Sequence, residues 1–283
     1  DSITYNCSLH DVCPYCYAYE QNKYFSEMPF RLLKSILNWI QELNDPIILK
    51  ILGGEATEYE HFGNFLDVLY QYPIIQPTLY TNGLFGIEVL SSLVKCDSIK
   101  HIFFHYDNKY VLRKPSEKKK FENNMFKLFE SGKKITLRYN TDELDFDFRE
   151  LLEYATKLNA DIVYSFSAPS MTNKEYINLL DYKPFLPRLE EFTRESSNIS
   201  VHVCSSRPFP LCLVEPQKRN IFKNQGNIQT TCEPYPTINP DGSFLICSVL
   251  FRCKSKPVKD KTHFFKLLET CVRISEKVKW QVP

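Results

Sequence analysis

Short runs of β-forming residues alternate with stretches of helical periodicity from the start of the chain to about Ser167. The runs are rich in Ile, Thr, Phe, Tyr and Val, and they cover residues 3–5, 47–52, 77–81, 101–105, 135–140 and 161–165. Between them apolar residues recur every three or four positions, as they do from Phe30 to Ile40, which is typical of amphipathic helices. Six strand–helix units in succession predict an α/β fold with parallel strands joined by right-handed crossovers. In such an array, functional residues gather just after the carboxyl ends of the strands.

This alternation fades after Ser167. Residues 167–187 are rich in Pro, Ser, Asn and Tyr, which predicts a connector, and we expect a helix over 187–196. Further along, Pro240-Asp241-Gly242 lies between alternating apolar residues and predicts a β-hairpin. The expected organisation is a barrel-like core over 1–170, a connector and helix over 171–200, and a small C-terminal α+β domain over 201–283.

Composition and charge narrow the class of protein. Hydrophobic residues make up 43% of the 283 residues, enough to build a substantial core. The 35 Lys and Arg residues nearly balance the 34 Asp and Glu residues, so we do not expect nucleic acid as a partner. The apolar runs are too short to span a membrane, and the first residues do not resemble a secretory leader. We therefore expect a cytoplasmic protein without a membrane partner.

The ten cysteines are unevenly placed, and three of them directly follow the first predicted strand. A secreted disulfide scaffold would be short and have little apolar core, whereas clustered cysteines in a leaderless protein favour a metal or iron–sulfur centre. Cys7, Cys13 and Cys16 supply three thiolates, with His10 inside the same loop. Structural zinc takes four protein ligands, whereas an iron–sulfur cube held by three thiolates keeps one iron open for a ligand. Both centres remain possible from these residues alone.

The segment Cys7-Ser8-Leu9-His10-Asp11-Val12-Cys13-Pro14-Tyr15-Cys16 resembles the cluster loop of the radical S-adenosylmethionine superfamily. That family holds a 4Fe-4S cluster with three cysteines, usually separated by three and then two residues, and an aromatic residue such as Tyr15 precedes the last one. This chain keeps the second spacing but has five residues between the first two cysteines. The resemblance implies a partial (β/α)6 TIM-like barrel that binds the cluster and S-adenosylmethionine.

Further segments resemble the family's cofactor contacts. Gly53-Gly54-Glu55 follows the second predicted strand, with Ala56 where the family has Pro, and resembles the motif that meets the amino group of S-adenosylmethionine. Glycines there permit close backbone approach, and oxygen atoms can accept hydrogen bonds from an ammonium group. The remaining cofactor-binding candidates, by resemblance or by position at the strand ends, are Thr81 and Asn82 after the third strand, Arg138 for the methionine carboxylate, and Asn140 and Ser165 for the ribose or the substrate.

A second cysteine pattern lies in the last third of the chain. Nine residues, Gly242 and four more residues separate Cys232 from Cys247, which resembles the opening of the SPASM and Twitch auxiliary-cluster domains. The expected hairpin folds the chain back so that both thiolates converge on one centre. Cys212 resembles an earlier ligand, and Cys253, Cys271 or Cys204 could supply a fourth. We expect one auxiliary 4Fe-4S cluster in a Twitch/SPASM-like domain, with a zinc site as the alternative.

The resemblance implies reductive cleavage of S-adenosylmethionine to a 5′-deoxyadenosyl radical that abstracts hydrogen from a substrate. The expected substrate is a ribosomally made peptide, and a separate leader-binding protein could deliver it because the first predicted strand starts almost at residue 1. An electron donor such as flavodoxin or ferredoxin is the other expected partner. The alternatives are a radical enzyme that oxidises or rearranges a sugar or nucleotide, and a non-catalytic zinc or iron–sulfur protein on the same fold.

Overall fold

A computed structural model provides the structure of the chain. It describes residues 2–10, 12–14, 16, 18, 27–141, 147–166, 182–196, 199–203, 215–218, 236–245 and 254–279. Of these residues, none belongs to a helix that combines the length and the apolar character needed to cross a lipid bilayer.

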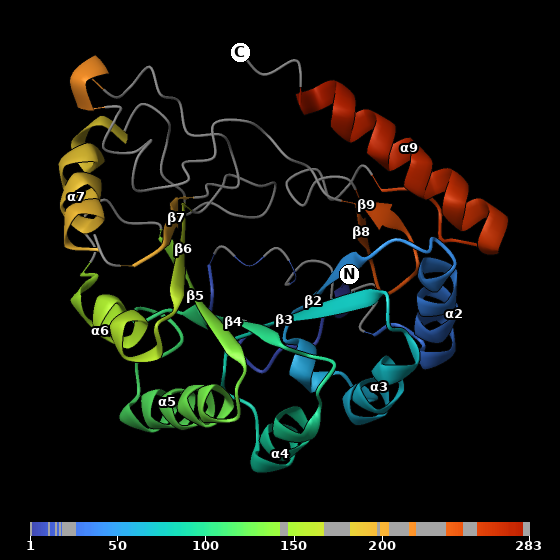
Figure 1. Ribbon diagram of the computed structural model, residues 1–283, viewed down its shortest axis with the longest axis horizontal. Coiled ribbons are helices and arrows are strands. Elements are labelled where there is room, and N and C mark those ends of the chain that lie inside the picture. The colour runs from blue at the N-terminus through green and yellow to red at the C-terminus, as the bar shows by residue number, and fades with distance from the viewer. Residues whose placement is uncertain are drawn as a thin grey trace.

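Seven parallel strands form one sheet in which each strand pairs with the next one along the chain (Figure 1). The six predicted strands are all present. The strands are β1 Ser2–Thr4, β2 Ile47–Gly53, β3 Ile75–Thr81, β4 His101–Tyr106, β5 Lys134–Thr141, β6 Asp161–Phe166 and β7 Val201–Val203. The order β1 to β7 brings all their carboxyl ends to one edge, and no pairing closes the sheet into a barrel among the described strands. The predicted α/β fold, an open partial barrel, is thus confirmed.

Helices connect the strands and lie along the outside of the curved sheet (Figure 1). They are α2 Phe30–Gln41, α3 Phe62–Val68, α4 Ile87–Lys95, α5 Pro115–Glu130, α6 Arg149–Leu158 and α7 Tyr182–Glu195, with short 3-10 turns η1 Ala56–Glu58 and η2 Leu69–Gln71. A further 3-10 turn, η5 Pro216–Lys218, follows the last strand of the sheet. Right-handed crossovers between sequential parallel strands place their helices on the same side of the sheet. The other side, which we call the inner face, is therefore left for side chains of the strands.

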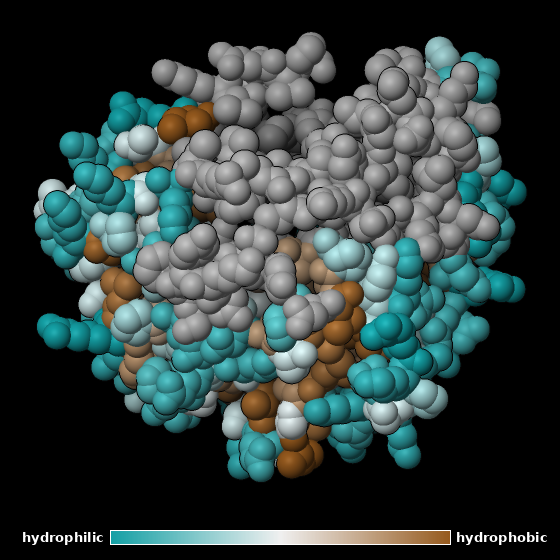
Figure 2. All heavy atoms as spheres, turned by 180° about the vertical axis from the view of Figure 1, so that it is seen from behind, coloured by the Kyte–Doolittle hydropathy of each residue, from teal (hydrophilic) through white to brown (hydrophobic). Residues whose placement is uncertain are grey.

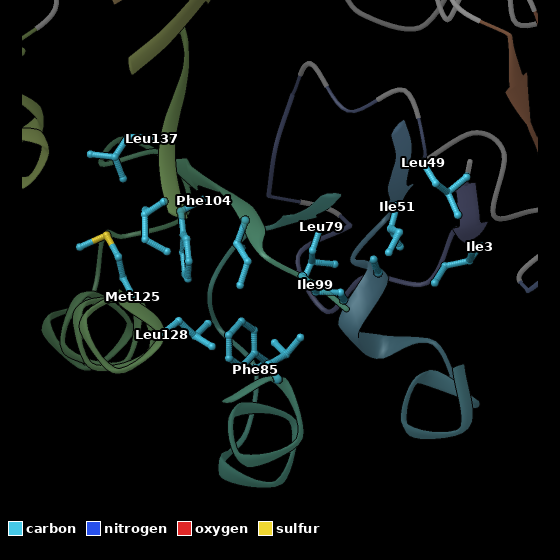
Figure 3. Packing of buried hydrophobic residues seen from close by; sticks show 14 of the residues in the cluster. Ile3, Leu49, Ile51, Leu79, Phe85, Ile99, Phe104, Met125, Leu128 and Leu137 are labelled. Carbon is cyan, nitrogen blue, oxygen red and sulfur yellow. The ribbon is translucent and has the colours of Figure 1, made fainter. Parts of the chain in front are cut away.

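The core fills the space between the sheet and these helices. On β4, Phe104 and Tyr106 are fully buried toward the helices, and the Phe104 ring lies 5.5 Å from that of Phe121 in α5. Figure 3 shows Leu79, Phe104 and Leu137 of three neighbouring strands on the side that faces α4 and α5. Because side chains alternate along a strand, the half-buried His105 and Arg138 lie on the inner face. Seen from behind, hydrophilic residues cover most of the described surface (Figure 2).

Two boundaries differ from the sequence prediction. β7 extends the sheet to a seventh strand inside the range 201–283 that we assigned to the C-terminal domain. Three residues, Val201–Val203, are too few to show a period-two pattern. Helix α7 begins at Tyr182 instead of Pro187, because Pro187 lies inside the helix and does not start it. The three predicted domains otherwise remain a prediction.

The C-terminal part contains the predicted hairpin and a helix that the sequence analysis missed. Strands β8 Thr237–Ile238 and β9 Phe244–Leu245 pair antiparallel, and Gly242 has a φ of +77°, a conformation that glycine adopts without strain. Helix α9 spans Lys261–Lys279. Phe264 of α9 lies 5.5 Å from Phe244 and 5.3 Å from Trp39 of α2, measured between ring centroids. The hairpin and α9 therefore pack beside α2, next to β1 (Figure 1).

Candidate functional site

The first cysteine loop begins at the carboxyl end of β1. Cys7, Cys13 and Cys16 are half-buried, and the backbone N–H of Cys16 donates to the carbonyl of Cys13 at 3.1 Å. The pKa of the Cys7 thiol is raised to about 12, mainly by burial and in smaller part by the nearby Glu55, Glu58 and Cys16, whereas a backbone hydrogen bond from Leu9 acts to lower it. A thiol in such surroundings is protonated until a cation replaces the proton.

Thiols are the ligands that iron–sulfur clusters take, so the donor type in this loop suits the predicted cluster. The positions of the described side chains do not yet form a metal site. Within the described part of the chain, no three His, Cys, Asp or Glu side chains are grouped closely enough to hold a metal ion. The assignment of Cys7, Cys13 and Cys16 as ligands thus remains a prediction.

The Gly53-Gly54 pair lies where the end of β2 meets the segment that leads into Cys7. A Cβ atom on Gly53 would lie 2.3 Å from the carbonyl oxygen of Thr4, and one on Gly54 would lie 2.4 Å from that of Asn6. The backbone N–H of Gly54 donates to the same Thr4 oxygen at 2.9 Å. The glycines are therefore required by the close approach of the cysteine loop's own backbone, in addition to any approach by a ligand.

Glu55 is buried, with 3% of its surface exposed, and it joins the loop after β2 to the loop after β3. Its Oε1 accepts from the backbone N–H of Thr57 at 3.1 Å and from the hydroxyls of Thr57 and Thr81 at 2.6 and 2.7 Å. Its Oε2 accepts from the backbone N–H of Asn82 at 2.7 Å. Burial raises the pKa of the Glu55 carboxyl above its ordinary value, and hydrogen bonds from Asn82, Thr57 and Thr81 lower it in part. Three of the predicted cofactor residues, Glu55, Thr81 and Asn82, thus form one hydrogen-bonded unit.

The neighbouring Glu58 of η1 is a contact that the sequence analysis missed. Its two carboxylate oxygens accept from the backbone N–H and the hydroxyl of Ser8, at 2.8 and 2.7 Å. These bonds attach the start of the cysteine loop to η1. The signal in the sequence was weak, because Glu58 belongs to no motif and its partner is fifty residues away.

Arg138, Asn140 and Ser165 each hold a buried polar atom that has no hydrogen-bond partner among the residues that the structure describes. These atoms are Nε of Arg138, Oδ1 of Asn140 and Oγ of Ser165. Asn140 and Ser165 are cross-strand neighbours on β5 and β6, and Arg138 lies two residues before Asn140 on the same face of β5. Buried polar atoms in native proteins are nearly always paired, so three unpaired ones together indicate a place for a polar ligand. The residues predicted to contact the cofactor therefore fit a polar, charged molecule such as S-adenosylmethionine.

An aromatic pair that the sequence analysis did not consider lies beside Arg138. The guanidinium carbon is 6.0 Å from the ring centroid of Tyr80 on β3, and Tyr80 stacks on Phe103 of β4 at 4.4 Å. No ion pair to Arg138 occurs among the described residues. A half-buried guanidinium beside an aromatic ring, with no ion-pair partner in the described part of the chain, suits an anionic group of a ligand.

The other predicted residues divide into two groups. Tyr15, Cys204, Cys212, Cys232, Cys247 and Cys253 lie outside the described residues, so their roles stay predictions. Cys271, an alternative fourth ligand, is buried in α9 within the hydrophobic core, and burial raises the pKa of its thiol. Cys96 caps the end of α4 and is half-buried.

Comparison with solved structures shows which proteins have a similar fold. SuiB of Streptococcus suis bound to S-adenosylmethionine superposes with a TM-score of 0.67 at 16% identity, covering 99% of this chain and 65% of SuiB. Native anSMEcpe with bound AdoMet gives a TM-score of 0.67 at 16% identity, over 100% of this chain and 83% of that one. Both are radical S-adenosylmethionine enzymes. This chain has the radical S-adenosylmethionine fold.

A third radical S-adenosylmethionine structure, anSMEcpe with bound AdoMet and the Kp18Cys peptide, matches with a TM-score of 0.64 at 15% identity over 98% of this chain and 81% of that one. No protein-family model and no curated protein matches the sequence. The chain spans about two thirds of the length of SuiB, at 65%. At these identities, the radical S-adenosylmethionine fold is what the chain has in common with these enzymes.

Proposed function

We propose that this protein is a radical S-adenosylmethionine enzyme. The observation that carries the proposal is the set of unpaired buried atoms on Arg138, Asn140 and Ser165. They belong to the same sheet whose carboxyl edge bears the cysteine loop and the Glu55 unit. A fold with this strand order, three cysteines after β1 and vacant hydrogen-bonding groups on β5 and β6 supports binding of an iron–sulfur cluster and S-adenosylmethionine together.

Each residue has a defined part in this proposal. Cys7, Cys13 and Cys16 would hold a 4Fe-4S cluster with one iron left open. When bound, this cluster supplies the electron that cleaves S-adenosylmethionine and yields a 5′-deoxyadenosyl radical able to abstract hydrogen. Arg138 would bind the carboxylate of the methionine moiety, and Asn140 would hydrogen-bond the ribose or the substrate together with its cross-strand neighbour.

Glu55 has both carboxylate oxygens occupied by the chain, so its side chain orients the loop that bears Asn82. The amino group of S-adenosylmethionine would then be bound by backbone carbonyl oxygens of the Gly53-Gly54 turn.

An auxiliary 4Fe-4S cluster bound by Cys212, Cys232, Cys247 and Cys253 belongs to the proposal. The β8–β9 hairpin supports it, because Thr237 pairs with Leu245, and these residues lie five after Cys232 and two before Cys247. A zinc ion held by the same thiols is the rival centre.

We propose a peptide as the substrate. The likeness to anSMEcpe solved with a bound peptide favours this class over the sugar or nucleotide alternative. The reducing equivalents would come from flavodoxin or ferredoxin, and a separate leader-binding protein could present the peptide. We also propose a cytoplasmic location, because clustered cysteines in that reducing compartment hold metal or iron–sulfur centres more often than disulfides.

Anaerobic reconstitution with iron and sulfide tests this function. We expect about eight irons per chain and formation of 5′-deoxyadenosine only when a reductant is present. Cys13→Ala should abolish 5′-deoxyadenosine while retaining about four irons. Cys96→Ala, the matched control, should change neither quantity. Bound zinc in place of iron, or no 5′-deoxyadenosine from the reduced wild type, would refute the proposal and favour the non-catalytic alternative. Formation of 5′-deoxyadenosine that survives Cys13→Ala would refute the role of Cys13 as a cluster ligand.

The substrate class needs a separate measurement. Binding of candidate precursor peptides to the reconstituted chain should be compared with a panel of sugars and nucleotides. Measurable affinity for a peptide supports the proposed class. Affinity for members of the small-molecule panel alone would replace it with the alternative.

A further inference from the structure

A buried hydrogen bond joins the C-terminal hairpin to the strand that leads into the first cysteine loop. Tyr5 directly follows β1 and stands two residues before Cys7. Its hydroxyl donates to Oδ1 of Asn239 at 2.6 Å, and the two residues are only 3% and 4% exposed. They are 234 positions apart in the chain, so this contact forms only when the hairpin is docked.

The hairpin holds Asn239 in the orientation that this bond requires. The Asn239 side-chain Nδ2 donates to Oγ of Ser243 at 2.9 Å, which leaves Oδ1 directed toward Tyr5. The backbone N–H of Asn239 also donates to the carbonyl of Ser243 at 2.9 Å. Asn239 is therefore fixed by the turn itself, and the acceptor moves with the hairpin as one body.

Other contacts also hold the segment from Thr4 to Ser8. The backbone N–H groups of Gly54 and Glu55 donate to the carbonyls of Thr4 and Asn6, and the side-chain amide of Asn6 donates to Oε1 of Glu27 at 3.0 Å in partly buried surroundings. The Ser8 contacts with Glu58 are exposed to solvent, where hydrogen bonds and charges contribute little to stability. The Tyr5 bond is a fully buried side-chain contact in this segment, and in such surroundings an unpaired partner is costly.

We propose that Tyr5 and Asn239 are positioning residues that couple docking of the β8–β9 hairpin to the order of the first cysteine loop. When the hairpin is docked, Tyr5 is held and Cys7 stays half-buried. When the hairpin is released, the segment before Cys7 loosens and the thiol becomes accessible. This coupling goes beyond the proposed function. Only the statement that the loop holds a cluster rests on the proposed function.

The test uses the full-length, metal-free, reduced chain under anaerobic conditions. The rate of alkylation of each cysteine by iodoacetamide is followed by peptide mass spectrometry in the wild type, Tyr5→Phe, Asn239→Ala and the double variant. Each single variant should speed alkylation of Cys7 at least about fivefold, since the loss of one buried hydrogen bond raises the open population by about that factor. The double variant should react no faster than the faster single variant, because both remove the same bond.

The chain supplies its own matched control. Tyr72 donates from its hydroxyl to Oδ1 of Asn38 at 3.0 Å, the same pair of groups away from the loop. Tyr72→Phe should leave the rate at Cys7 unchanged. An unchanged rate in Tyr5→Phe, additive effects in the double variant, or equal acceleration at Cys96 would overturn the coupling. A chain with coupled alkylation that forms no 5′-deoxyadenosine would refute the proposed function and leave the coupling intact.

Discussion

Glu55→Gln tests whether the carboxylate joins the two loops as its contacts indicate. The backbone N–H groups of Thr57 and Asn82 point at different oxygens of the carboxylate, at 3.1 and 2.7 Å. Glutamine keeps one oxygen and replaces the other with an NH₂ group, which only donates. Whichever way the amide turns, one buried backbone N–H faces another donor. We expect the free energy of unfolding to fall by about 2 kcal/mol, the cost of one unsatisfied buried group.

Thermal unfolding of the metal-free chain, followed by circular dichroism, measures this loss. A fall of about 2 kcal/mol corresponds to a midpoint lower by roughly 4 to 8 °C for a domain of this size. Glu58→Gln on the same 3-10 turn is the matched control, because Glu58 accepts at a solvent-exposed position. Its midpoint should change by less than about 2 °C. If Glu55→Gln is as stable as the wild type, the carboxylate does not join the loops in the way described.

Three further predictions concern Gly54, Arg138 and Asp241. Gly54→Ala should destabilise the chain by about 3 kcal/mol, because its Cβ would lie 2.4 Å from the carbonyl oxygen of Asn6; Gly63→Ala, with no atom within 4 Å, should raise the thermal midpoint slightly. Arg138→Met should weaken binding of S-adenosylmethionine to the reconstituted chain about 10- to 100-fold in calorimetry while the thermal midpoint stays unchanged; equal affinity would exclude the proposed carboxylate contact. Burial alone would raise the pKa of the Asp241 carboxyl, but hydrogen bonds from Ser243 and Lys254 lower this pKa overall. The ionised carboxylate therefore stabilises the fold above its ordinary pKa of 3.8, and this stabilisation is lost as the pH falls through the lower pKa of the folded state. Between about pH 5 and pH 3 the midpoint of Asp241→Asn should therefore fall less than that of the wild type, and parallel curves would contradict this.

The strands could be predicted because the residues that face the helices are apolar and recur with a period of two. The periodicity of apolar residues predicts a strand or a helix when the element is long enough to show the repeat, as in β4 or α2. It failed for β7, which has three residues. It was overlooked in α9, where Phe264, Leu267, Leu268 and Cys271 do follow a helical period. Cysteine spacing alone makes Cys271 a candidate ligand, whereas the helical period correctly places it in the core.

The site could be located from sequence because motifs that follow successive parallel strands must meet at one edge. Its internal contacts could not be predicted. That Gly54 is required by the backbone of Asn6 depends on the register between β1 and β2. That Glu55 has both oxygens occupied depends on where Thr81 and Asn82 lie once β3 is paired. Such contacts follow from tertiary distances, and no local pattern encodes them.

The sequential order of the sheet has a consequence for the way the chain is assembled. Each βα unit can add to the one made just before it, so the sheet can grow in the direction of synthesis. The contact between Trp39 and Phe264 breaks this rule, because it joins an early helix to a segment made after all seven strands of the sheet. The N-terminal edge of the sheet is therefore completed only after its C-terminal edge. We expect any metal centre there to be installed after α9 has been made, on a chain whose remaining strands are already in place.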